Sequence, residues 1–287
     1  MGRVSAQPMA GTGPAAFDVR LGDGRVVRVH DTGGDTARPT VVWHHGSPQT
    51  GALLEPLLTA AAARTIRLVS YGRPGYGGST PQPGRDVAAA AGDVAEVADA
   101  LGLERFAVMG ASGGGPHALA CAALLPDRVT GAVVLAGIAP FDGTPAWYEG
   151  MVDPSGLRAA AAGRRARAEH ALTEEFDEAS FVDADWAALA GPWACLGRDA
   201  GRAGEEGPGG LVDDDVAFAS PWGFDLGAVS APVLVVQGGR DRVVPPSHAD
   251  RLLAAVPTAQ LWLRPADGHV SVLAACPVAM DWLLDPR

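Results

Sequence analysis

FAVMGASGGGPHALA, residues 106–120, holds the pattern Gly-x-Ser-x-Gly between an apolar run and an Ala-rich stretch. The apolar run predicts a buried strand, and the Ala-rich stretch predicts a helix. A sharp strand-to-helix turn forces the serine at its tip, Ser112, into a strained backbone conformation, and the small residues Gly110 and Gly114 make this possible. Pro116 fits the first helical turn, where N–H groups have no partner within the helix. The stretch therefore predicts a serine at the end of a strand, beside a helix N-terminus.

Apolar runs bounded by turn residues alternate with helical stretches along most of the chain. Gly22-Asp23-Gly24 separates the first two runs and predicts a hairpin. The predicted strands are 17–21, 26–30, 40–43, 66–69, 106–109, 132–135, 233–236 and 260–263, and the predicted helices are 53–63, 87–101, 116–125, 247–255 and 270–284. Continuous apolar strands are typical of parallel sheets buried on both faces. We therefore predict an α/β fold with a mostly parallel central sheet and helices on both faces.

Residues 140–230 interrupt this alternation, because they contain no convincing strand. They combine an Arg-rich run at 164–167 with acidic clusters, and they hold four of the seven Trp residues. These are Trp147, Trp186, Trp193 and Trp222. Such side chains pack a small helical lobe or line an apolar pocket, and the two roles are compatible. We predict that residues 1–139 and 231–287 form the core and that residues 140–230 form an inserted helical cap, called the cap segment below.

A serine nucleophile needs a base, and position in the predicted fold separates the candidate His residues. His269 follows the last predicted strand, so it lies at the carboxyl edge of the sheet, where active sites of open α/β sheets lie. Asp241, the carboxylate expected to fix the His tautomer, follows the strand 233–236 in the same way. Asp267 is the nearest alternative, but it is too close to His269 in sequence to support the far ring nitrogen. The order Ser112, Asp241, His269 therefore predicts a catalytic triad.

An oxyanion formed at this serine needs two N–H donors. We expect one from the backbone of Gly113 and the other from the backbone of Ser47, because the next residue, Pro48, has no N–H. His45, in the same loop, is expected to anchor the loop rather than to act in catalysis. His248 begins a predicted helix after two prolines and is expected to be exposed.

Composition excludes several functions. The net charge of −11 argues against partners such as nucleic acid or an anionic membrane. The chain has no Lys, so it lacks the lysine of Schiff-base enzymes and of phosphate-binding loops. Cys121, Cys195 and Cys276 fit neither a zinc site nor a disulfide framework, and we expect buried free thiols. With no long apolar stretch and no secretory leader, we expect a cytoplasmic protein that acts on a small-molecule substrate without cofactor or metal; its oligomeric state stays open.

Five motifs together resemble the α/β-hydrolase superfamily, in the branch with a serine nucleophile and a helical cap. They are His45-Gly46-Ser47-Pro48, Arg73-Pro74-Gly75-Tyr76-Gly77-Gly78-Ser79, Gly110-Ala111-Ser112-Gly113-Gly114, Gly238-Gly239-Arg240-Asp241 and Gly268-His269. The resemblance covers nearly the whole chain outside the cap segment and implies the α/β-hydrolase fold with the triad above. Haloalkane dehalogenases and epoxide hydrolases of this branch carry Asp where this chain has Ser112, so we expect neither activity. The Arg73 loop is interpreted as structural, because its Gly and Pro satisfy backbone geometry.

These observations predict a serine hydrolase that cleaves an ester of a small, largely apolar substrate through an acyl-enzyme, as in the carboxylesterases it resembles. An aminopeptidase of the proline-iminopeptidase type is one alternative. Acidic residues at 174–178 would then receive the substrate amine, although such runs are usually solvated helix faces. A biosynthetic thioesterase, lyase or cyclase is another alternative. A non-catalytic ligand-binding protein on the same fold is the alternative from a different class.

Overall fold

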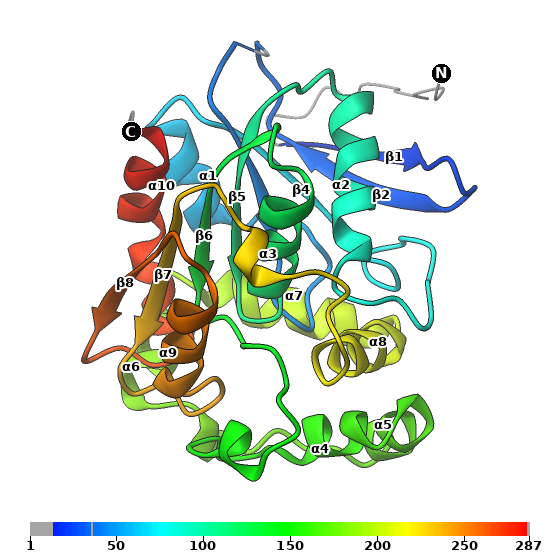
Figure 1. Cartoon of the computed structure of the whole chain (residues 1–287), viewed down its shortest axis with the longest axis vertical. Helices are drawn as coiled ribbons and strands as arrows, with labels where there is room; N and C mark the ends of the chain where they lie inside the picture. Colours follow the sequence, from blue (N-terminus) through cyan, green and yellow to red (C-terminus); the bar gives the residue numbers. More distant parts are fainter. Residues whose placement is uncertain (1–13, 36, 286–287) are drawn as a thin grey trace.

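The central element of the computed structural model, which describes residues 14–35 and 37–285, is an eight-stranded sheet (Figure 1). Its strands are β1 (Ala15–Arg20), β2 (Val26–Asp31), β3 (Thr40–His44), β4 (Arg67–Tyr71), β5 (Phe106–Ala111), β6 (Val129–Leu135), β7 (Val233–Gly238) and β8 (Ala259–Arg264). The strand order is β1-β2-β4-β3-β5-β6-β7-β8. β2 is antiparallel to both β1 and β4, and all other neighbours are parallel. The predicted mostly parallel sheet is confirmed.

Helices cover both faces of the sheet, and the side chains of β5 alternate between them. Phe106 and Val108 pack in the apolar core on one face, which helices α2, α3 and α9 cover, whereas Ala107 and Met109 pack on the other face, under α1 and α10 (Figure 1). The bounds of these helices are α1 (Glu55–Ala62), α2 (Ala89–Ala100), α3 (Gly114–Leu124), α9 (Pro246–Ala255) and α10 (Cys276–Leu284). This arrangement makes the carboxyl edge of the sheet the place where loops from several strands meet.

The prediction of one helix over 270–284 is wrong in detail. The structure has a 3-10 helix, η4 (Ser271–Ala275), followed by α10, which begins at Cys276. Pro277 lies in the first turn of α10. Because proline has no N–H and its ring clashes with the preceding turn, an α-helix does not continue back through this position.

Between β6 and β7 the structure describes helices and no strand, as predicted for the cap segment. The elements are η1 (Pro145–Tyr148), α4 (Ser155–Ala161), α5 (Arg164–Ala171), η2 (Glu178–Ser180), α6 (Asp183–Ala190), α7 (Ala194–Glu205), α8 (Gly209–Phe218) and η3 (Leu226–Ala228). Figure 1 shows α4, α5 and α8 beyond the carboxyl ends of β6 and β7. Three of the four Trp residues in the segment are buried and pack against the core; only Trp186 is exposed, at 39%. Treating residues 140–230 as a separate cap stays our interpretation.

The described residues were compared with the features of a membrane-spanning helix and of a metal site, and neither is found among them. Within 14–35 and 37–285, no helix is long and apolar enough to cross a membrane. In the same ranges, no cluster of His, Cys, Asp and Glu has an arrangement that could hold a metal ion. The three cysteines are free, but only Cys121 and Cys276 are buried; Cys195 is half-buried, so the prediction of buried thiols is wrong for it.

Candidate active site

Ser112 lies at the sharp turn between β5 and α3, with a backbone φ of 52°. Positive φ is uncommon for a residue with a side chain, so this serine is held in a strained conformation. The turn is also tightly packed, because a Cβ atom at position 114 would lie 2.0 Å from the carbonyl oxygen of His44. Only glycine fits there. The strand, the turn and the helix thus occur as the Gly-x-Ser-x-Gly pattern predicts.

The structure brings Ser112, His269 and Asp241 together in one hydrogen-bonded chain. Ser112 Oγ lies 3.1 Å from His269 Nε2, and His269 Nδ1 lies 2.8 Å from Asp241 Oδ2. The second carboxylate oxygen of Asp241 accepts the N–H groups of Val243 and Val244, each at 2.9 Å. These bonds fix the carboxylate behind the imidazole. The chain of contacts has the order that nucleophilic catalysis requires of nucleophile, base and orienting acid.

The alternative carboxylate, Asp267, is engaged elsewhere. It forms an ion pair with Arg264, the last residue of β8. The sequence argument that favoured Asp241 over Asp267 therefore agrees with the geometry.

His269 is a half-buried imidazole whose pKa lies above its ordinary value of 6.5. Burial by itself would lower this pKa, because it disfavours the charged ring. The charge of Asp241 and its hydrogen bond outweigh burial, and the charge of Asp185 adds to them. Proton uptake by His269 is thus assisted by two carboxylates, one from the core and one from the cap segment.

The two expected oxyanion donors, Ser47 and Gly113, are neighbours in space. A Cβ atom at position 113 would lie 2.5 Å from Ser47 Oγ. Within residues 14–35 and 37–285, the backbone N–H groups of these two residues have no acceptor. They are therefore available to a ligand bound at Ser112.

Behind Ser47 lies a buried ionic cluster that the sequence reasoning missed. Asp214, from α8, accepts the Ser47 hydroxyl at 2.5 Å and the Tyr76 hydroxyl at 3.0 Å. The same carboxylate pairs with Arg73 at 2.7 Å and with Arg85 at 2.8 Å. The Gly and Pro of the Arg73 loop indicate a structural role for the loop but none for the Arg73 side chain. The guanidinium of Arg73 joins the cap segment to the Ser47 loop.

The two guanidiniums decide the charge state of Asp214. Burial alone would raise the pKa of this carboxyl, but Arg73 and Arg85 outweigh it and hold the pKa well below the ordinary range. Asp214 is thus a carboxylate whose negative charge is compensated within contact distance. Arg73 also donates to Ser47 Oγ at 2.9 Å, so both charges hold the same hydroxyl.

His45 anchors its loop, in line with the expectation. Its Nδ1 lies 2.7 Å from the carbonyl oxygen of Gly46, so Nδ1 carries the hydrogen, and Nε2 accepts the N–H of Arg73 at 3.1 Å. The expectation for His248 is wrong, because this residue is buried. Its ring accepts the N–H of Ala139 and contacts the carbonyl of Trp147, so it joins α9 to the start of the cap segment. Two preceding prolines therefore do not imply exposure.

The fold and the site together define a class of protein. The chain matches the sequence family described as alpha/beta hydrolase fold over residues 39–274, most of its length. The protein therefore belongs to the α/β hydrolase fold family, as the five motifs indicated.

Individual relatives agree on the family and differ in their named activities. A non-heme chloroperoxidase of Streptomyces lividans is 28% identical over 258 residues, which cover 80% of this chain and 84% of the relative. A bromoperoxidase of Bacillus anthracis has a structure with a TM-score of 0.74 and 22% identity, covering 94% of this chain and 99% of the other. The enol-lactonase of Burkholderia xenovorans LB400 has a TM-score of 0.70 and 21% identity, covering 93% and 100%. Likeness at this level of identity shows the fold alone.

Proposed function

We propose that the protein is a serine hydrolase that cleaves an ester of a small, largely apolar substrate. The observation that supports this most is the unbroken hydrogen-bonded chain from Asp241 through His269 to Ser112. It ends beside the N–H groups of Ser47 and Gly113, which have no acceptor among the residues that the structure describes. A nucleophile, a base, an orienting carboxylate and an oxyanion site are the complete set that acyl transfer requires.

In the proposed reaction, His269 Nε2 takes the Ser112 proton as Oγ attacks the ester carbonyl. The oxyanion of the tetrahedral intermediate accepts the N–H groups of Ser47 and Gly113. Asp241 stabilises the imidazolium, which then protonates the departing alcohol. A water molecule, deprotonated by the same His269, attacks the acyl-enzyme and releases the acid. Ser112 regains its proton at the end of the cycle.

The aminopeptidase alternative depended on free acidic side chains at 174–178. Glu174 is paired with the buried Arg167 at 2.8 Å, and Asp177 caps η2 by accepting the N–H of Ala179. Neither carboxylate is therefore free to receive a substrate amine in this arrangement. Glu175 and Glu178 of the same run are exposed, so the aminopeptidase alternative is left to the substrate comparison below.

The test is to label the protein with a fluorophosphonate probe and to identify the modified peptide by mass spectrometry. We expect labelling at Ser112 and none in Ser112→Ala. Hydrolysis of p-nitrophenyl esters, compared with that of amino acid anilides, then separates an esterase from an aminopeptidase. A folded protein that neither labels nor hydrolyses any of these substrates would contradict the proposal and favour the ligand-binding alternative.

A further inference from the structure

Asp185, on cap-segment helix α6, is a fully buried carboxylate that binds the loop carrying the candidate base. Its Oδ1 accepts the N–H of Val270 at 2.8 Å, and both the N–H and the hydroxyl of Ser271, at 2.7 and 2.8 Å. Its Oδ2 accepts the N–H of His269 at 3.2 Å and that of Val182, at the start of α6, at 3.1 Å. One side chain thus holds three consecutive backbone N–H groups that begin at His269.

Three successive N–H groups that converge on one point form an anion-binding concavity, and here the anion is a side chain of the same chain. The carboxylate lies close against the backbone of the turn. A Cβ atom at position 268 would lie 2.1 Å from Asp185 Oδ2. Gly268 therefore permits the carboxylate to approach, and its own N–H is accepted by Ser271 Oγ at 2.7 Å. The backbone N–H groups of residues 268–271 are thus all accepted by the side chain of either Asp185 or Ser271.

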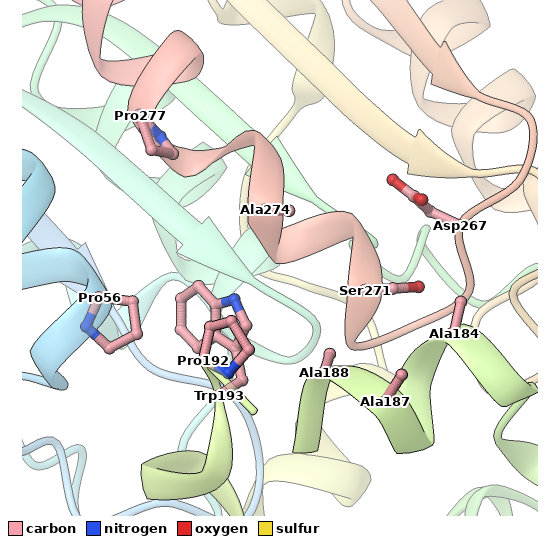
Figure 2. Close-up of a pocket in the computed structure, with 10 residues that line it drawn as sticks. All are labelled: Pro56, Ala184, Ala187, Ala188, Pro192, Trp193, Asp267, Ser271, Ala274 and Pro277. Carbon is pink, nitrogen blue, oxygen red and sulfur yellow. The ribbon is translucent and has the colours of Figure 1, made fainter. Parts of the chain in front are cut away.

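The contact between α6 and η4 borders an open hollow of about 430 Å³, whose lining includes Ala184, Ala187 and Ala188 of α6 and Ser271 and Ala274 of η4 (Figure 2). Apolar packing also joins the two elements, since Ala188 and Leu189 pack against the cluster that contains Val272 and Leu273. Asp185 adds the hydrogen bonds between them.

We propose that Asp185 is a positioning residue for the proposed hydrolysis: it holds the His269 loop so that the imidazole meets Ser112, and it couples the cap segment to the base. The proposal rests on the proposed function only for its catalytic readout. Asp185 reaches the backbone of His269 and not the ring, so it takes no part in bond making. Its contribution is to orientation and to the local charge.

The charged groups around His269 determine in which direction the pH profile is expected to move. Asp241 contacts the ring from the loop after β7, and Asp185 contacts the backbone N–H of the same residue from α6. Asp267, two residues before His269, is neutralised by Arg264. Asp241 and, to a smaller extent, Asp185 raise the pKa of His269, and removing either charge lowers it. A base with a lower pKa stays neutral, and hence active, to a lower pH.

The decisive variant is Asp185→Asn, which keeps the shape of the side chain and removes its charge. On an ester that the wild type cleaves, we expect kcat to fall by up to about 100-fold, because a small displacement of the base is enough for such a loss. KM should change little, and the acid limb of the pH profile should move to lower pH. Amide hydrogen exchange over residues 266–275 should become faster.

Asp183→Asn is the matched control, since Asp183 lies exposed in the same helical turn, and it should behave as the wild type. Ser271→Ala removes one donor to Asp185 and the acceptor of the Gly268 N–H but keeps the charge, so it should accelerate exchange and lower kcat without moving the acid limb. Ser271→Ala also tests the proposal if Asp185→Asn does not fold. An Asp185→Asn protein with wild-type kcat and pH profile, or a Ser271→Ala protein with wild-type exchange and kcat, overturns the proposal.

A second readout separates this proposal from the proposed function. The pKa of His269 can be followed by NMR of its ring, with no substrate present. If the wild type hydrolyses nothing, the hydrolase proposal fails, yet a lower His269 pKa and faster exchange in Asp185→Asn would still support the positioning role. Unchanged pKa and exchange would overturn it.

Discussion

Asp185 and Asp214 both extend from the cap segment into loops of the core, and both are fully buried, but their partners differ. Asp185 is surrounded by neutral donors, which are backbone N–H groups and the Ser271 hydroxyl. Asp214 is held by two guanidiniums, Arg73 and Arg85, as well as by hydroxyl groups. One carboxylate holds the loop of the proposed base, and the other holds the loop of the expected oxyanion donor.

This difference determines which group each charge acts on. After Asp241, Asp185 helps to raise the pKa of His269, whereas Asp214 acts on the buried rings of His45 and His117, where the charge of Arg73 opposes it. A carboxylate bound by neutral donors can tune a nearby base, while one bound by cations mainly fixes structure. The following predictions test this contrast.

The largest expected effect is on the stability of Asp214→Ala. Removing this carboxylate leaves Arg73 and Arg85 buried without a counter-charge, which costs about 3–5 kcal/mol in comparable cases. Asp185→Ala should lower the free energy of unfolding by about 1–3 kcal/mol, because it leaves neutral donors beside a hollow that water can enter. Urea unfolding measures both.

Asp183→Asn again provides the control and should unfold like the wild type. If Asp185→Ala is destabilised as strongly as Asp214→Ala, then neutral and cationic partners hold the two carboxylates equally well, and the contrast is wrong.

An intermediate effect is expected in the pH dependence of stability. The pKa of Asp214 in the folded protein lies well below its unfolded value of about 3.9, so its charge stabilises the fold above that value. This contribution is lost as the pH falls toward the folded pKa. The difference in unfolding free energy between wild type and Asp214→Asn should therefore be constant from neutral pH to about pH 5 and should shrink below about pH 4. A difference that grows on acidification would refute the assignment.

The smallest effect is expected from Ala187→Leu, which places apolar volume in the hollow between α6 and η4. Because Ala187 is exposed and the hollow is open to solvent, the leucine should raise the free energy of unfolding by no more than about 0.5 kcal/mol. The gain should be larger in an Asp185→Ala background, where the hydrogen bonds across the contact are gone. Equal gains in both backgrounds would show that packing and hydrogen bonding at this contact are independent.

Much of the fold and of the triad could be predicted because both are encoded by local patterns. Each strand is a short apolar run, and Ser112, Asp241 and His269 each lie in the turn or loop that follows one. Parallel strands end at the same edge of the sheet, so residues far apart in the sequence are brought together once the strands are recognised. The helix predicted over 270–284 failed for an equally local reason, the proline in the first turn of α10.

The two cap carboxylates could not be found in this way. Asp185 binds residues 84 to 86 positions away, and Asp214 binds Arg73 across 141 positions. No strand or turn pattern in the sequence indicates that these residues meet. The path of the cap segment depends on how its helices pack, and not on the alternation of strands and helices that sets the path of the core. The acidic run that contains Asp214 was visible, but acidic runs are more often solvated. His248 was expected at the surface because two prolines precede it, and its burial depends on distant partners, the N–H of Ala139 and the carbonyl of Trp147.

The close approach at Gly268 has a consequence for engineering. Chimeric enzymes are often made by exchanging one insertion for another while the catalytic scaffold is kept. In this protein, an exchanged segment that lacks a carboxylate at the position of Asp185 would leave the turn at 268–271 without its acceptor, and a scaffold with any larger residue than glycine at 268 would reject this segment. Helix α6 and the histidine turn therefore form one transplantable unit, and a recombination junction should not separate them.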